Sequence, residues 1–105
     1  MEYPELEPVL SAILKTVPVR KIMLFGSRAR GEGRPESDYD LLIVVPPEYK
    51  TMRAWKDLYE VTSKVKRDFS LDLILATEED LEKYRNAWMT VYPKALKEGR
   101  VLYAA

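Results

Sequence analysis

The sequence predicts an α/β fold, a small mixed β-sheet of about four strands covered by helices. Two patterns lead to this prediction. Short apolar runs bounded by Pro, Gly or polar residues are typical of buried strands, and longer stretches with apolar residues every three or four positions are typical of helices. Both patterns recur along a chain of 105 residues. This length suits a modest core, so we expect a single domain over residues 1–105.

The first helix is predicted near the N-terminus, where apolar residues follow helical spacing over about three turns. Pro4 and Pro8 must lie before this helix or in its first turn, where a missing N–H costs little, and Pro18 must end it. Lys21–Phe25 and Tyr39–Val45 are then expected to be buried strands. In the first helix, the apolar residues at helical spacing are Leu6, Val9, Leu10, Ile13, Leu14 and Val17.

The second half of the chain predicts a longer helix and two further strands. Apolar residues from Met52 through Trp55 and Tyr59 to Phe69 indicate a helix over roughly Thr51–Asp68. The later elements are a strand over Ser70–Ala76, a helix with Thr77 as its N-cap, and a last short strand over Arg100–Tyr103.

One segment has two interpretations. Residues 86–98 could form a helix or a broken helix, because Pro93 fits only near its start or at a kink. Its apolar residues could belong to the core or could form an exposed patch for a partner. These residues are Trp88, Val91, Tyr92 and Leu96.

Composition limits the chemistry that is available. The chain has no cysteine and no histidine, so it lacks disulfides, thiolate zinc sites and the commonest general base. Reactions must therefore use carboxylates, hydroxyls, Lys, Arg and bound hard cations. The 17 basic and 17 acidic residues balance, which argues against binding of long nucleic acid. The N-terminal MEYPELEP begins no long apolar run, so we expect no signal peptide, no membrane span and a cytoplasmic location.

The residues that suggest a function begin at Asp38 and Asp40. If Tyr39–Val45 is a strand, residues two apart share one face, roughly 7 Å apart along the strand. Tyr39 would then face the helices, and Ser37 could cap the preceding turn or contact a metal shell. Two carboxylates on one face repel each other unless a cation or donors intervene, so a purely structural role would be costly. Such a pair can bind hard divalent cations.

Gly26 and Ser27 end the strand that precedes the aspartate pair. Backbone N–H groups and a hydroxyl at such a strand end can meet phosphate oxygens. An ordinary turn is the alternative, and it would be preferred if the aspartates did not follow. Arg28, Arg30 and Arg34 cluster in the exposed loop beyond, where an arginine could contact a phosphate.

These residues carry a family resemblance. Gly26-Ser27, a spacer of about ten residues, and Asp38-Tyr39-Asp40 before an apolar run resemble the signature of the DNA polymerase beta-like nucleotidyltransferase superfamily. The fuller form, GSRARG…SDYDLLIVV, is similar to its smallest members, the minimal nucleotidyltransferases (MNT). These are often paired with HEPN-domain proteins in toxin–antitoxin modules. The resemblance implies the nucleotidyltransferase fold for the predicted sheet and helices.

The resemblance also implies a role for Asp72, the one charged residue in its apolar strand. The superfamily commonly has a third acidic residue on a neighbouring strand, facing the aspartate pair, and Asp72 matches that place. A salt bridge to a nearby arginine is the alternative. Asp38, Asp40 and Asp72 are thus implied as catalytic residues that bind two Mg²⁺ ions and transfer AMP from ATP to a hydroxyl. The implied nucleotide-binding residues are Gly26, Ser27, Arg28, Arg30 and Ser37, with the family pattern favouring the first two arginines over Arg34.

The short chain would hold only a catalytic core, so a partner chain or a homo-oligomer is expected to complete the site. The resemblance implies a HEPN-domain ribonuclease toxin as that partner, silenced by modification of a tyrosine hydroxyl. Two alternatives remain: an antitoxin that neutralises its partner by contact alone, and a nucleotidyltransferase that acts on a small molecule or an RNA end.

Overall fold

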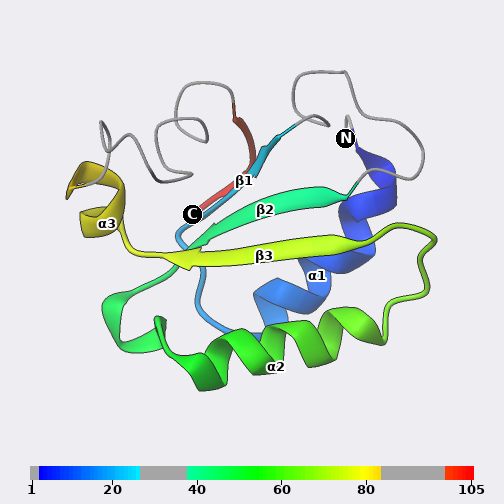
Figure 1. Ribbon diagram of the computed structural model, residues 1–105, viewed down its shortest axis with the longest axis horizontal. Coiled ribbons are helices and arrows are strands. Elements are labelled where there is room, and N and C mark those ends of the chain that lie inside the picture. Colours follow the sequence, from blue (N-terminus) through cyan, green and yellow to red (C-terminus); the bar gives the residue numbers. More distant parts are fainter. Residues whose placement is uncertain (1–2, 27–37, 84–98) are drawn as a thin grey trace.

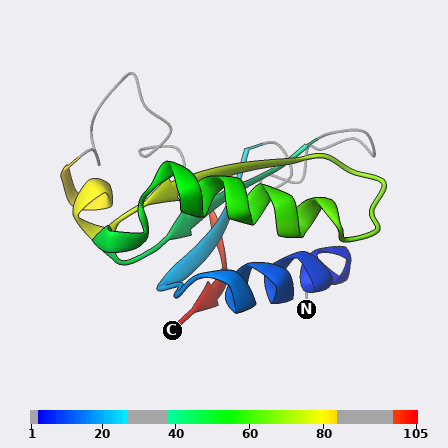
Figure 2. The same cartoon turned by 90° about the horizontal axis from the view of Figure 1, so that it is seen from below.

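A computed structural model describes residues 3–26, 38–83 and 99–105. Within these residues, two helices lie side by side on one face of a four-stranded sheet (Figures 1 and 2). A short third helix follows the edge strand β3. The elements are α1 (Glu7–Thr16), β1 (Lys21–Phe25), β2 (Tyr39–Val44), α2 (Met52–Ser63), β3 (Leu71–Ala76), α3 (Glu78–Lys83) and β4 (Arg100–Ala104), with short 3₁₀ turns η1 (Pro4–Leu6) and η2 (Pro47–Tyr49). The predicted fold is confirmed, and each predicted strand is correct to within one residue.

The sheet is mixed, in the order β3-β2-β1-β4. β1 pairs antiparallel with β2, which places Phe25 opposite Asp40. β2 pairs in parallel with β3, which places Asp40 beside Asp72. β1 also pairs antiparallel with β4, with an irregularity between Ile22 and Met23. Asp40 therefore lies on an inner strand, between β1 and the acidic position of β3.

The inner strand β2 is buried on both faces, as its continuous apolar sequence predicts. Its side chains alternate between two apolar clusters. The cluster under the helices includes Tyr39, Leu41 and Ile43 of this strand, Val45 beyond it, and Leu24 of β1. The opposite cluster contains Met23, Phe25, Leu42, Val44, Ala76 and Leu81.

Helix α1 begins after η1, with Pro8 in its first turn, and ends at Thr16 before an extended Val17. Both prolines thus lie where the missing N–H was expected to be harmless. One stripe position is wrong: Leu14 is 37% exposed, whereas Val9 and Ile13 are fully buried.

Helix α2 ends at Ser63, five residues before the predicted end. Val65 and Phe69 still pack against the core, and this is why the apolar spacing suggested a longer helix. Past the helix, the Arg67 side chain donates hydrogen bonds to the backbone carbonyls of Thr62 and Phe69. These bonds stabilise the loop between α2 and β3.

The exposed side of α2 also differs from the prediction. Met52 is 66% exposed and Trp55 is 38% exposed, so neither is a core residue. Trp55 instead reaches β3, where its indole Nε1 donates a hydrogen bond of 3.0 Å to the Leu73 carbonyl.

Tyr39 fixes the beginning of β2. Its ring is only 3% exposed and makes edge-on contacts with Tyr3 and Phe69, and its hydroxyl donates a hydrogen bond to Glu5. Tyr39 therefore faces the helix side, as predicted, and leaves the neighbouring aspartates to the other face.

Helix α3 begins with a reciprocal pair of hydrogen bonds. The Thr77 hydroxyl accepts from the Asp80 backbone N–H at 3.0 Å, and the Asp80 carboxylate accepts from the Thr77 N–H at 3.0 Å. The predicted N-cap is thus confirmed. Lys50 Nζ also lies 2.6 Å from the Asp80 carboxylate. Burial alone would raise the pKa of Asp80, but the hydrogen bonds from Lys50 and Thr77 together lower it below its usual value.

We expect the substitution Asp80→Asn to lower the free energy of unfolding by about 1 kcal/mol at pH 7, because a cap bond and a partly exposed ion pair are lost. A lowered carboxyl pKa in the folded state stabilises above the unfolded value and loses that effect as the pH falls through the folded value. The difference between wild type and D80N should therefore shrink below about pH 4. Urea titrations at pH 7 and at acidic pH measure it. The exposed neighbour Glu79→Gln is the matched control, and an equal loss in both variants would contradict the prediction.

None of the helices within the described ranges is long and apolar enough to cross a membrane. The predictions for residues 86–98, including the core or interface role of Trp88, Val91, Tyr92 and Leu96, fall outside the described residues.

Candidate functional site

The candidate site is built where β1 ends against β2. Gly26, the residue after β1, has a φ of +79°, a conformation that side-chain-bearing residues rarely adopt. A Cβ atom at this position would overlap the Asp40 carboxylate oxygen Oδ2. Glycine is thus required twice, by its backbone conformation and by the close approach of a carboxylate. The close approach of Asp40 thus explains why glycine stands at position 26.

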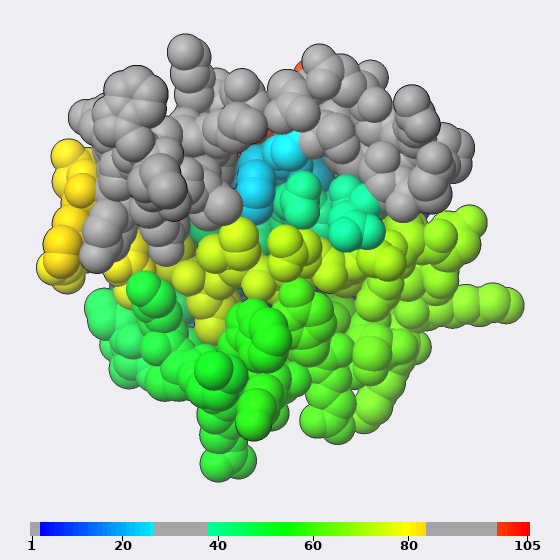
Figure 3. Space-filling view, in the orientation of Figure 1, coloured from blue at the N-terminus to red at the C-terminus, as the bar shows by residue number. Residues whose placement is uncertain are grey.

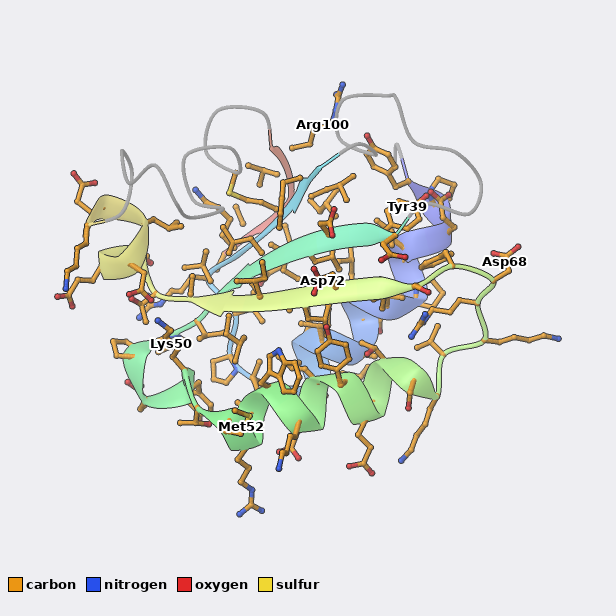
Figure 4. The ribbon with its side chains drawn as sticks, in the orientation of Figure 1. Tyr39, Lys50, Met52, Asp68, Asp72 and Arg100 are labelled. Atoms are coloured by element: carbon orange, nitrogen blue, oxygen red, sulfur yellow. The ribbon has the colours of Figure 1, made fainter. Side chains whose placement is uncertain are left out.

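Three aspartates surround this point. Asp40 is half-buried, whereas Asp38, just before β2, and Asp72, on β3, are exposed. Paired residues on parallel strands carry their side chains on the same face, so the register places Asp40 and Asp72 together. Figure 4 shows Asp72 on β3, next to the strand that Tyr39 begins.

The charges of these aspartates interact. Burial raises the pKa of Asp40, and the negative charges of Asp72 and Asp38 raise it further. Asp40 therefore lies within the electric field of both other candidates. The sequence-based expectation that a β3 carboxylate faces the aspartate pair agrees with this arrangement.

The alternative role for Asp72, a salt bridge, is not seen in the part of the chain that the structure describes. Ion pairs between described residues join Arg20 to Glu78, Lys50 to Asp80 and Lys64 to Glu60, and none of these pairs includes Asp72. The Tyr59 hydroxyl of α2 instead accepts a hydrogen bond of 2.8 Å from the N–H of Leu73, the residue after Asp72. Burial raises the pKa of Tyr59, and the charge of Asp72 raises it further. From the sequence, Tyr59 was expected only in the apolar stripe of its helix. The hydroxyl at the tip of its ring was the one sign of another role.

The residues suit a hard cation by the type of their donor atoms. Carboxylate oxygens are the ligands that Mg²⁺ prefers, and the chain has no histidine or cysteine to bind softer metals. Over residues 3–26, 38–83 and 99–105, no three acidic side chains converge closely enough to hold a metal ion as they stand. Because Asp38 and Asp72 are exposed, their carboxylates have room to turn toward a cation beside Asp40.

The other predicted nucleotide-binding residues, Ser27, Arg28, Arg30 and Ser37, lie outside the described ranges. Their proposed contacts with phosphate stay predictions. Gly26, which directly precedes this segment, is the one member of that group whose placement is described.

The molecule has an apolar groove, and none of the three aspartates lines it. That groove, of about 420 Å³, lies between the start of α2 and the edge of β3, and its lining includes Met52, Trp55 and Leu75. Figure 3 shows β3 crossing this face, with α2 on one side and the surface of β2 on the other. The candidate site at the β1–β2–β3 strand ends is therefore not this groove, although the lining of the groove begins at Leu73, next to Asp72.

The placement of Gly26 against the Asp40 carboxylate, with Asp72 on the paired strand, is what the structure shows of the predicted phosphate and cation site. Comparison with known proteins agrees. The family model described as "Polymerase beta, Nucleotidyltransferase" matches residues 9–105. A protein of Methanocaldococcus jannaschii named "Putative protein adenylyltransferase MJ0604" is 36% identical over 87 residues, which cover 81% of this chain and 79% of that protein.

Solved structures with a similar fold include "Crystal structure of the toxin-antitoxin with AMP-PNP", with a TM-score of 0.67 and 19% identity, covering 100% of this chain and 75% of that one. Another is "Crystal structure the toxin-antitoxin MntA-HpeT mutant-Y104A", with a TM-score of 0.62 and 19% identity, covering 92% and 70%. At these identities the likeness shows the fold. The chain belongs to the polymerase beta nucleotidyltransferase family and is a nucleotidyltransferase.

Proposed function

We propose that this nucleotidyltransferase uses Mg²⁺ to transfer AMP from ATP to a tyrosine hydroxyl of a HEPN-domain toxin, and so acts as an antitoxin in the cytoplasm. The observation that carries the proposal is the contact between Gly26 and the Asp40 carboxylate, with Asp72 beside it on β3. In this proposal the strand end at Gly26 binds phosphate beside the acidic metal ligands. A relative named for protein adenylylation supports a protein as the acceptor, and structural neighbours named toxin–antitoxin support a toxin as the partner.

The three aspartates have distinct roles in this proposal. Asp38, Asp40 and Asp72 would hold two Mg²⁺ ions, which when bound would supply positive charge for the triphosphate and lower the pKa of the attacking hydroxyl. Asp72 accepts the hydroxyl proton. The hydroxyl oxygen bonds to the α-phosphorus while the bond from that phosphorus to the bridging oxygen breaks, so pyrophosphate leaves with the electron pair.

The turn after β1 holds the leaving group. The backbone at Gly26 and the hydroxyl of Ser27 bind the terminal phosphates, and Arg28 or Arg30 adds positive charge. Ser37 supports the same nucleotide from the other side of the loop. The partner chain completes the site by bringing the acceptor hydroxyl.

The test is an intact-mass measurement. The purified protein, with the chain that co-purifies with it, is incubated with ATP and Mg²⁺. We expect an AMP-sized gain on the partner chain, and no gain with the D40N variant. Asp68→Asn is the matched control, because Asp68 is exposed in the loop before β3, outside the aspartate cluster (Figure 4).

Two other results would redirect the proposal. If the complex forms tightly without any mass gain, the protein neutralises its partner by contact alone. If AMP instead appears on an RNA end or a small molecule added to the reaction, the acceptor in the proposal is wrong while the nucleotidyltransfer stands.

A further inference from the structure

The outer edge of the sheet is the side of β3 that faces away from β2. The Ala76 carbonyl accepts a hydrogen bond of 2.8 Å from Val45, the residue after β2. Backbone groups alternate sides along a strand, so in this register the even-numbered residues of β3 bond to β2. The N–H and C=O groups of Leu71, Leu73 and Leu75 therefore face outward. Such a row of backbone groups is a template on which a strand of another molecule can pair.

Two side chains of α2 bond to the middle of this edge. The Tyr59 hydroxyl accepts a hydrogen bond of 2.8 Å from the Leu73 N–H, and the Trp55 indole Nε1 donates one of 3.0 Å to the Leu73 carbonyl. The two rings pack edge to face, with centroids 4.5 Å apart. Both outward groups of Leu73 are thus bonded to side chains of the helix, in the place where a further strand would bond.

The neighbouring outward groups are different. Within the described residues, no hydrogen bond occupies the outward N–H or carbonyl of Leu75, and this residue lines the apolar groove together with Trp55 and Met52. Another chain could therefore reach Leu75 from solvent. To add a full strand it would also have to pair with Leu73, where the two aromatic side chains are bonded.

We propose that Trp55 and Tyr59 close the outer edge of the sheet and so keep β3 of one molecule from pairing with β3 of a second copy. Leu73 has already used its N–H and its carbonyl, and the aromatic rings lie where the backbone of an added strand would run. Natural sheets commonly protect an exposed edge with charges, prolines or bulges. β3 has the sequence LDLILA, with one charge and no proline, so the helix supplies protection that the strand itself lacks.

A second copy is the partner that this edge fits. Two identical strands can pair antiparallel about a two-fold axis, in which case one residue pairs with itself. With Leu73 opposite Leu73, Leu71 would lie opposite Leu75, and the outward groups of both strands would bond to each other. The same register would place Asp72 opposite Ile74, so no two carboxylates would lie directly opposite each other.

Hydrogen exchange of the wild-type protein tests the closed edge directly. The amides of Leu73 and Leu75 both face outward on one strand, but Leu73 has an acceptor, so its amide should exchange at least about tenfold more slowly. In Tyr59→Phe, which keeps the ring and removes the acceptor, this difference should disappear. Equal exchange of the two amides in the wild type would overturn the proposal.

A second experiment measures self-association by analytical ultracentrifugation over a concentration series. Trp55→Ala/Tyr59→Phe frees both outward groups of Leu73 and removes the larger ring. Met52→Ala is the matched control, because Met52 is 66% exposed and lines the same groove, and its loss leaves both bonds to Leu73 in place. We expect the dissociation constant for self-association of the double variant to fall at least about tenfold below that of wild type, and Met52→Ala to match wild type. The Leu75 amide of the double variant should become protected at high concentration.

A proline at position 75 identifies the surface that associates. Leu75→Pro removes an outward N–H and spares the bonds to β2, so adding it to the double variant should reverse the self-association. Self-association that survives Leu75→Pro, or that Met52→Ala shows equally, would overturn the proposal. If thermal melts show that the double variant does not fold, Trp55→Phe/Tyr59→Phe takes its place with the same expected results, because it loses both bonds and keeps two rings.

Discussion

Replacing Asp40 with asparagine is expected to reduce AMP transfer by on the order of 10³-fold or more, because a metal-stabilised transition state is worth several kcal/mol and each 1.4 kcal/mol is about tenfold in rate. Asp40 is the central member of the cluster. It lies against Gly26 on one side and beside Asp72 on the other, and it is the least exposed of the three aspartates. Asparagine has nearly the same shape as aspartate but no charge. The loss of AMP transfer should therefore come from the missing charge and not from a change in packing.

The same variant should stay folded. The pKa of Asp40 is raised by burial and by two neighbouring carboxylates, so the ionised side chain destabilises the folded protein. Removing its charge should leave the melting temperature, measured without metal, equal to that of wild type or higher. Added Mg²⁺ should raise the melting temperature of wild type and have little effect on D40N. A large fall in the stability of D40N without metal would show that Asp40 is structural, contrary to the proposal.

Gly26→Ala is expected to lower the free energy of unfolding by about 2 kcal/mol, because a left-handed backbone is costly for any residue with a Cβ. A second effect comes from the overlap between that Cβ and the Asp40 carboxylate. Relief of the overlap must move the carboxylate, and a displacement of about 1 Å at a catalytic group can reduce activity by about 10². We therefore expect a variant that folds but transfers AMP at least about a hundredfold more slowly.

Urea denaturation and the AMP-transfer assay measure the two effects separately. The double variant Gly26→Ala/Asp40→Ala is informative as well, because the shorter side chain at 40 removes the overlap and leaves only the backbone strain. If the double variant is no more stable than the sum of the two single changes predicts, the close approach of Asp40 has no energetic weight. If Gly26→Ala alone transferred AMP at the wild-type rate, the proposed role of Gly26 in the site would be wrong.

The sequence predicted most of the fold because the strands are continuous apolar runs with clear ends. Lys21–Phe25 was predicted to the residue, and β2 and β3 to within one. Helix ends were harder. α2 was predicted too long because Phe69 keeps the helical spacing of the apolar residues after the backbone has left the helix. Apolar spacing reports which side chains reach the core, and a loop can also deliver them there.

The candidate site was predicted in part, for a related reason. Asp40, Asp72 and Gly26 stand out in a sequence because charge in a buried strand, or glycine at its end, needs an explanation. Tyr59 does not stand out, since its ring fits the apolar stripe and the use of its hydroxyl depends on which strand edge it meets. Such a contact between distant segments follows from the tertiary fold and not from local pattern.

The pairing of β1 with β4 has a consequence for how the protein folds. Lys21 pairs with Ala104, roughly eighty residues later in the sequence, and contacts between such distant residues slow folding because a long loop must close first. Until β4 arrives, one edge of β1 has no neighbour, and its unpaired backbone N–H and C=O groups could pair with a strand of another molecule. We therefore expect the chain to be most prone to aggregation before β4 has paired with β1.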